Sequence, residues 1–187
     1  MILLTGGTGL VGSHILYELT ARGEKVRATR RENSNAEIVD RLFRFYAGEE
    51  AGQLLDRIEW INADLADYYS LEDALDGVTR VIHAAAMVSF NPREAQKMLN
   101  VNSEGTANLV DACLDKGIEK FCFVSSVSSL GRHSADKEID EDVEWQADDN
   151  RSAYSYSKFR AEMEVWRASK EGLPVIVVNP SVIIGPV

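Results

Sequence analysis

The sequence predicts an α/β fold in which helices cover both faces of one parallel sheet. Short apolar runs alternate with amphipathic helical stretches along the whole chain, the pattern that successive βαβ units produce. The runs are nearly all apolar, as is typical of strands buried on both faces. A glycine-rich turn follows the first run and opens a helix. With 187 residues, the chain suits a single domain, residues 1–187, with a sizeable core.

The individual elements follow from the spacing of apolar residues and from the glycines that end helices. Residues 1–5 form an apolar strand, and the helix 10–22 places Val11, Ile15 and Leu19 on one face. The elements predicted after it are strand 25–30, a mostly helical connection 36–56, strand 58–62, helix 69–76, strand 80–85, a long helical stretch 93–116, strand 120–125, an irregular segment 127–151, helix 152–171 and strand 174–179. Because right-handed crossovers leave few topologies for such strands, we expect the doubly wound sheet of a Rossmann fold.

Charge and composition argue against several classes of partner. The formal net charge of −10 argues against nucleic acid or a membrane surface, because both select an excess of Lys and Arg. No apolar run approaches the roughly 18 residues of a membrane span. The first residues are typical of a strand and not of a signal peptide, so we expect a cytoplasmic protein. The acidic segment 138–149 is expected to be a solvated loop.

The cysteines and histidines do not form a recognisable metal-ligand set. Cys113 and Cys122 lie in apolar surroundings, so we expect buried thiols and not a disulfide or a metal site. His14, His83 and His133 are scattered through a helix, a strand and a loop. Packing or solvent contact is the expected role of each.

The turn TGGTGLVGS has the features of a dinucleotide-binding loop. It places Gly6, Gly9 and Gly12 three residues apart between a strand and a helix, the context that such a site requires. Gly6 allows a tight turn, Gly9 lets the backbone approach a pyrophosphate, and Gly12 lets helix and strand pack closely. The helix N-terminus then offers free N–H groups and a positive dipole end to the phosphates. The alternative is a glycine turn without a ligand.

Two arginines stand where the cofactor's ribose is recognised. Arg30 and Arg31 follow the second strand, at the position where an acidic side chain would bind a free 2′-hydroxyl. Adjacent guanidinium groups suit a 2′-phosphate, so the sequence favours NADP(H), with NAD(H) left open. The alternative is two solvated surface arginines. Asp64, after the third strand, is a candidate acceptor for the adenine amino group, or else a cap of the next helix.

The reactive candidates lie at the end of the fifth strand and in the last helix. Tyr154 and Lys158 are four residues apart and share one helical face, whereas Tyr156 points elsewhere. A nearby ammonium should lower the phenol's pKa and make it usable as a general acid or base. Ser125 and Ser126 end a strand whose carboxyl end should face the ligand crevice, and strand alternation points them in different directions. Each is a candidate donor to a substrate oxygen, or else a turn residue.

Six motifs together carry a resemblance to a known superfamily. They are TGGTGLVGS at 5–13, HAAA at 83–86, NSEGT at 102–106, FVSS at 123–126, YSYSK at 154–158 and NPSVIIGP at 179–186. In this order they resemble the extended short-chain dehydrogenase/reductases, most of all the branch of dihydroflavonol reductases and 3β-hydroxysteroid dehydrogenases, near the NAD-dependent epimerase/dehydratase group. A serine–serine–leucine run at 128–130 replaces the threonine–valine–tyrosine run usual in sugar-nucleotide epimerases, which weakens that interpretation.

The resemblance implies a catalytic set of serine, tyrosine and lysine. The serine matches Ser126, because Gly131 stands five positions further on. Tyr154 matches the general acid/base, and Lys158 matches the residue that also holds the nicotinamide ribose. Asn102 matches an asparagine that supports the active site.

The resemblance also places a shell of residues around the cofactor. Ala84 to Ala86 match a stretch that lines it, and Arg31 matches an arginine that contacts the 2′-phosphate in the reductase branch. The full set implied is Gly6, Thr8, Gly9, Leu10, Val11, Gly12, Arg30, Arg31, Asp64, Leu65, Ala84, Ala85, Ala86, Ser125, Lys158, Pro180 and Val182.

These assignments predict an NADP-dependent reductase/dehydrogenase that acts on a small-molecule ketone or secondary alcohol. One alternative is a sugar-nucleotide epimerase or dehydratase that uses tightly bound NAD. Another is a non-catalytic dinucleotide sensor, which would not need the serine, the tyrosine and the lysine. A homodimer is the assembly to test.

The resemblance further implies that residues 1–187 lack most of a C-terminal substrate lobe, because similar proteins continue well past the sixth strand. We therefore expect this chain alone to expose apolar surface and to associate. We also expect it to bind NADP(H) weakly and to turn over little substrate, and a longer chain from the same gene to recover activity.

Overall fold

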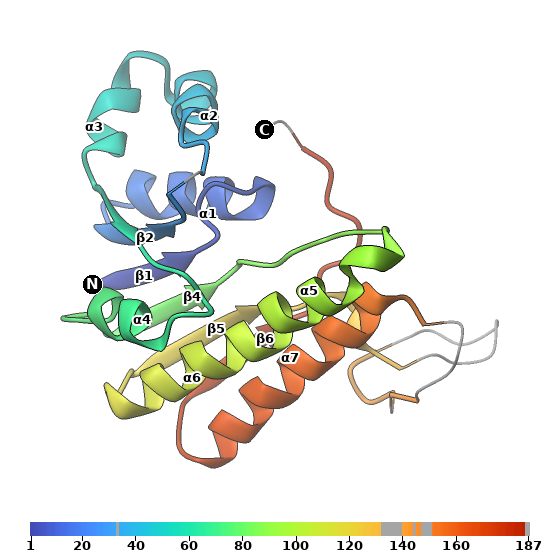
Figure 1. The fold of residues 1–187 in the computed structure, drawn as a ribbon. Helices are drawn as coiled ribbons and strands as arrows, with labels where there is room; N and C mark the ends of the chain where they lie inside the picture. The colour runs from blue at the N-terminus through green and yellow to red at the C-terminus, as the bar shows by residue number, and fades with distance from the viewer. Residues whose placement is uncertain (33, 132–139, 144, 147–150, 186–187) are drawn as a thin grey trace.

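A computed structural model describes residues 1–32, 34–131, 140–143, 145–146 and 151–185 of the chain. It contains a six-stranded parallel sheet in the order β3-β2-β1-β4-β5-β6 (Figure 1). The strands are β1 (Ile2–Thr5), β2 (Val26–Arg30), β3 (Ile58–Asn62), β4 (Arg80–His83), β5 (Lys120–Val124) and β6 (Val175–Val178). The predicted doubly wound topology is confirmed, and every strand was expected within about two residues of its bounds.

Helices form a layer on each face of the sheet (Figure 1). On one face lie α1 (Leu10–Ala21), α2 (Glu37–Ala47) and α3 (Ala51–Leu55), with a short 3₁₀ turn, Gly48–Glu50, before α3. On the other lie α4 (Tyr68–Ala74), α5 (Ala95–Leu99), α6 (Gly105–Asp115) and α7 (Ala153–Lys170). Neighbouring residues of β1 face the two layers in turn, since Leu4 packs under α1 and α2 whereas Leu3 belongs to the core with α6 and α7.

The last strand departs from the predicted burial. Val175 and Val177 pack against the core under α7, but Ile176 and Val178 are 46% and 43% exposed. The expectation that both faces of the sheet are covered is therefore wrong for β6, because no described helix lies over its second face (Figure 1). The exposed apolar surface expected of this chain is present here. Beyond β6, Ile183 and Ile184 lie along α1 and help to line a cavity of about 430 Å³.

The long helical stretch predicted at 93–116 is interrupted. It consists of a 3₁₀ turn (Pro92–Glu94), α5, the π-helical turn η3 (Asn100–Glu104) and α6. Single π-turns within helices often lie at functional sites. This one carries Asn102, one of the predicted site residues.

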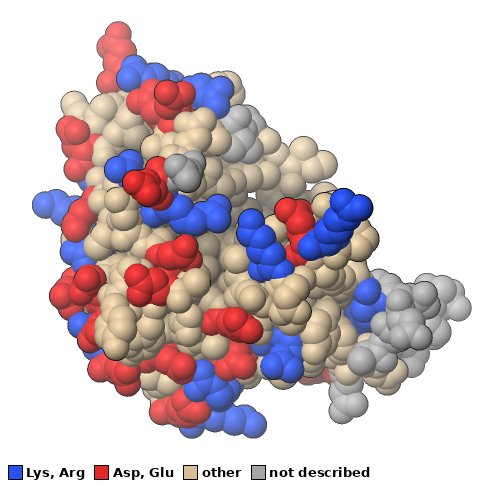
Figure 2. All heavy atoms as spheres, viewed as in Figure 1, with Lys and Arg blue, Asp and Glu red and all other residues tan. Residues whose placement is uncertain are grey.

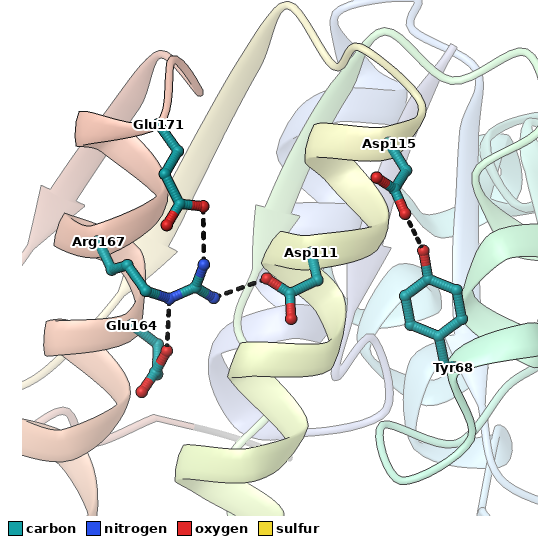
Figure 3. Close-up of polar contacts among 6 residues, drawn as sticks. All are labelled: Tyr68, Asp111, Asp115, Glu164, Arg167 and Glu171. Atoms are coloured by element: carbon teal, nitrogen blue, oxygen red, sulfur yellow. Dashed lines mark hydrogen bonds and ion pairs between the residues drawn. The ribbon is translucent and has the colours of Figure 1, made fainter.

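Polar contacts hold α4, α6 and α7 together as one layer (Figure 3). Arg167 on α7 donates to Asp111 on α6 at 2.6 Å and to two carboxylates of its own helix. Tyr68 on α4 donates to Asp115 on α6, and this hydrogen bond raises the pKa of Tyr68 to about 12. These side chains are partly exposed, so each ion pair contributes roughly 1 kcal/mol or less. Their effect is to fix the orientation of α7, which carries Tyr154 and Lys158.

Both cysteines and His14 lie in the described part of the chain. Both cysteines are free thiols, with Cys113 buried and Cys122 half-buried, and burial raises the pKa of each. His14 is half-buried and packs against Tyr46, whereas His133 and much of the acidic segment 138–149 lie outside the described residues. Within the described part of the chain, no helix could cross a membrane and no group of three metal-ligating side chains occurs. Figure 2 shows acidic and basic side chains interspersed, with acids frequent where α4 lies.

Candidate active site

The glycine turn forms a backbone cradle that side chains would fill. Gly6 adopts a φ of +76°, and a Cβ there would lie 2.7 Å from the Cα of Ala85. A Cβ on Gly12 would lie only 2.0 Å from the carbonyl oxygen of Gly6. The tight turn and the close packing predicted for these glycines are thus present. Gly9 is exposed and begins α1 without a side-chain cap, so the helix N-terminus can receive a phosphate.

Arg30 at the carboxyl end of β2 lies over Trp60 of β3, whose ring reaches the glycine cradle. The guanidinium carbon of Arg30 lies 5.9 Å from the Trp60 ring centroid. A Cβ on Gly7 would lie 3.5 Å from the Cη2 atom of that ring. Arg31 is exposed, and no carboxylate is paired with either arginine among the described residues. Both guanidinium groups therefore remain available to an anion.

The third strand ends in a loop that brings Asp64 to a hollow of about 180 Å³. Asp64 accepts a hydrogen bond from the amide of Ala66 within this loop. The cap of α4 is Asp67, which accepts from Tyr69 and Ser70, so the alternative role considered for Asp64 belongs to another residue. Leu65 lines the same hollow.

His83 is buried in a polar chain that joins three elements. The Thr106 hydroxyl donates to the Asn102 carbonyl at 2.5 Å, so it accepts from Nε2–H of His83 at 3.0 Å. Nδ1 of His83 then accepts from the Thr5 hydroxyl at 2.6 Å, which accepts in turn from the Ala85 amide. This pattern fixes one neutral tautomer of the imidazole. These hydrogen bonds link the end of β1, the stretch after β4 and the π-turn.

Acid should destabilise the fold through His83. Burial lowers the pKa of His83 to about 3, whereas an unfolded histidine binds a proton below about 6.5. The contribution of His83 to the free energy of unfolding is therefore complete above about pH 6.5. It is lost as the pH falls, by roughly 2 kcal/mol between about pH 7 and pH 5. Urea unfolding of the wild type and of His83→Gln at both pH values measures this. The variant should show the smaller pH dependence, and equal dependences would contradict the prediction.

The proposed catalytic serine and tyrosine face each other across the sheet edge. Ser126 is buried, caps the 3₁₀ turn Val127–Ser129, and accepts from the Ser128 amide at 3.1 Å. Tyr154 lies in the first turn of α7, and its interaction with the Ser126 side chain lowers the pKa of the phenol. Tyr156 is 40% exposed on another face of the helix. The structure thus agrees with the helical face assigned from the sequence.

Lys158 lies one turn after Tyr154 and is only 2% exposed. Its ammonium donates to the Val124 carbonyl at 2.9 Å and lies 4.3 Å from the Phe123 ring centroid. Burial lowers the pKa of Lys158 to about 8, against the opposite effect of Glu162. The expectation that Lys158 lowers the pKa of Tyr154 is wrong for this structure. Burial raises the pKa of Tyr154, and only the interaction with Ser126 opposes the rise, because the ammonium is directed to β5.

Asn102 supports the site from the π-turn. Its amide is hydrogen bonded to both backbone groups of Met87, at 2.7 and 2.9 Å, and donates to the Ser157 hydroxyl at 3.0 Å. Ser157 lies between Tyr154 and Lys158 and bonds back to the Tyr154 carbonyl. Asn102 therefore ties the segment after β4 to the start of α7.

The remaining predicted residues occupy different surroundings. The Ser125 hydroxyl points away from Ser126 and donates to the buried carboxylate of Glu162 at 2.6 Å, so the predicted divergence of the two serines is confirmed. The Pro180 carbonyl accepts from the Val127 amide, and Val182 is exposed. The sequence interpretation missed Glu162. Its spacing of four residues from Lys158 was the available signal.

Comparison with known proteins agrees with the resemblance read from the motifs. Residues 2–187 match the NAD dependent epimerase/dehydratase family. The chain is 30% identical to a putative dihydroflavonol 4-reductase of Synechocystis sp., over 98% of this chain and 49% of that protein. It is 32% identical to cinnamoyl-CoA reductase 1 of Oryza sativa subsp. japonica, over 100% of this chain and 54% of that protein. The chain thus spans about half the length of these curated relatives.

Solved structures share the fold. One is a short-chain dehydrogenase/reductase superfamily protein from Agrobacterium tumefaciens with bound NAD, with a TM-score of 0.72 and 26% identity over 96% of this chain and 48% of that one. Another is UDP-glucuronic acid 4-epimerase from Bacillus cereus in complex with NAD, with a TM-score of 0.79. At 22% identity, over 98% of this chain and 57% of that one, the second likeness concerns the fold alone.

Proposed function

We propose a function for this chain, which belongs to the NAD dependent epimerase/dehydratase family. It carries the cofactor-binding and proton-transfer half of an NADP-dependent reductase/dehydrogenase for ketones or secondary alcohols. The observation that carries this proposal is that Ser126 lies close enough to Tyr154 to lower its pKa, one helical turn from the buried amine of Lys158. The names of the curated relatives, which include reductases of dihydroflavonol and of cinnamoyl-CoA, support the direction of the reaction.

The site residues supply the proton and stabilise charge. A nicotinamide cofactor, which the glycine cradle and Lys158 would hold, would supply the hydride. Tyr154 protonates the carbonyl oxygen, and its raised pKa keeps the phenol protonated at neutral pH, as a general acid requires. The Ser126 hydroxyl donates to the same oxygen and stabilises its developing negative charge. Lys158, protonated below about pH 8, holds the ribose of the cofactor.

An NADPH-oxidation screen of aldehydes, ketones and nucleotide sugars tests this proposal, with residues 1–187 and with a longer chain from the same gene. Net NADPH oxidation with a carbonyl compound is the expected result. Interconversion of a nucleotide sugar without net oxidation would favour an epimerase or dehydratase instead. Binding of the dinucleotide without any turnover in the longer chain would favour a sensor.

The same site should prefer the 2′-phosphorylated cofactor. We expect NADPH to bind roughly 10- to 100-fold more tightly than NADH, because two guanidinium groups can each donate to the phosphate. Calorimetric titration of both cofactors measures the preference. Replacing Arg30 and Arg31 together by Ala should erase it, whereas Arg22→Ala, at the C-terminus of α1, should leave it intact. Equal or tighter binding of NADH to the wild type would refute the NADP assignment.

A further inference from the structure

Glu162 is a buried carboxylate that the proposed chemistry does not use. It lies on α7 and is 8% exposed. One of its oxygens accepts from Ser125 at 2.6 Å, from Ser129 at 2.7 Å and from the Asn179 amide at 3.0 Å. The other accepts from the indole of Trp166 at 3.2 Å. Burying a carboxylate is costly unless donors surround it, so this arrangement is built for a negative charge.

The donors around Glu162 also reach the backbone of the proposed catalytic serine. The two hydrogens of the Asn179 amide can serve Glu162 and the Ser126 carbonyl at the same time, at 3.0 and 3.2 Å. The Ser129 hydroxyl has one hydrogen and lies 2.7 Å from each of the same two acceptors, so it donates to one of them at a time. Ser129 follows β5 and Asn179 follows β6. Glu162 therefore joins the ends of two strands at the point where Ser126 is held, without touching the Ser126 side chain.

Glu162 lies one helical turn after Lys158 on α7, and its negative charge favours the protonated amine. Within the described residues, the titratable groups that face Lys158 are Tyr154 and Glu162 on its own helix and His83 on β4. From β5 it meets only the Val124 carbonyl and the Phe123 ring. The imidazole is neutral in its hydrogen-bond chain, so Glu162 alone among these groups can balance a buried ammonium.

We propose that Glu162 is a positioning residue, whose carboxylate holds Ser126 in place through Ser129 and Asn179 and keeps Lys158 protonated. The proposal rests on the proposed function, because Ser126 and Lys158 matter only if they act on substrate and cofactor. It assigns Glu162 no contact with either.

Glu162→Gln is the direct test, because it keeps the shape of the side chain and removes the charge. We expect kcat for the carbonyl substrate to fall at least about 10-fold while KM changes less than about 3-fold. NADPH affinity should also begin to fall at a pH about one unit lower than in the wild type, since Lys158 loses its counter-charge. Glu164→Gln, which removes a partly exposed carboxylate paired with Arg167 on the same helix, should change neither. Thermal unfolding of both variants separates these effects from loss of the fold.

A second variant keeps the proposal testable if Glu162→Gln does not fold. Asn179→Ala removes one link to Ser126 and leaves the charge, so it should lower kcat about 3- to 10-fold without moving the pH at which NADPH affinity falls. Wild-type kcat in Asn179→Ala, or wild-type kcat and pH dependence in Glu162→Gln, would overturn the proposal. These kcat values are measured in the longer chain from the same gene. If that chain reduces no carbonyl without any substitution, the proposed function fails by itself, and calorimetry of NADPH binding against pH still decides whether Glu162 controls Lys158.

Discussion

Replacing Tyr154 by Phe is expected to lower kcat for carbonyl reduction roughly 10²- to 10⁴-fold, the usual contribution of a general acid, and to leave NADPH affinity nearly unchanged. The substitution removes one hydroxyl and keeps the ring. That hydroxyl interacts with Ser126, and burial raises its pKa, so it stays protonated at neutral pH. Steady-state NADPH oxidation gives kcat, and calorimetric titration gives the cofactor affinity.

The chain offers a matched control two residues further on. Tyr156 is 40% exposed and lies with its ring centroid 6.0 Å from that of Trp145, so Tyr156→Phe should retain wild-type turnover. A more harmful effect at Tyr156 than at Tyr154 would show that the wrong tyrosine carries the proton. A large loss of NADPH affinity in Tyr154→Phe would instead indicate a binding role.

The strands and the glycine cradle could be predicted because their causes are local in sequence. An apolar run bounded by turn residues forms a strand wherever it lies in a sheet. The close approach of Gly12 to the Gly6 carbonyl is what the three-residue glycine spacing encodes. The helical face of Tyr154 and Lys158 likewise depends only on a spacing of four residues.

Features that depend on contacts between distant segments were missed. The π-turn at Asn100–Glu104 coincides with the bonds from Asn102 to Met87 and Ser157, which no periodicity reveals. The apolar composition of β6 predicts burial but does not specify what covers each face, and in the described residues Ile176 remains half-exposed.

The electrostatic surroundings of Glu162, Lys158 and Tyr154 also depend on contacts between distant segments, so the sequence did not reveal them. In sequence, Glu162 is one of two acidic residues on a polar helix, and only the fold brings the ends of β5 and β6 against it. The proximity of Lys158 to Tyr154 in sequence suggested a lowered pKa for the phenol. The fold instead buries the tyrosine and directs the amine to the Val124 carbonyl, so the desolvation of Tyr154 has the larger effect.

Replacing Lys158 by Met should damage turnover and cofactor binding together. We expect kcat to fall about 10²-fold or more and the Kd of NADPH to rise roughly 10-fold, because the ammonium is assigned to the ribose and its loss also misplaces the nicotinamide for hydride transfer. Methionine is similar in length and apolar, so it can occupy the buried space beside the Phe123 ring. Lys170→Met, at the exposed end of α7, should leave both quantities unchanged.

The pH dependence of binding distinguishes a charge effect from a packing effect at this position. Because burial lowers the pKa of Lys158 to about 8, the amine is charged below that pH and neutral above it. Wild-type affinity for NADPH should therefore weaken between about pH 7 and pH 9, and Lys158→Met should show the weak affinity at both. Calorimetric titration at the two pH values measures this. Lost turnover with unchanged affinity in the variant would restrict Lys158 to the tyrosine, and unchanged turnover would remove it from the mechanism.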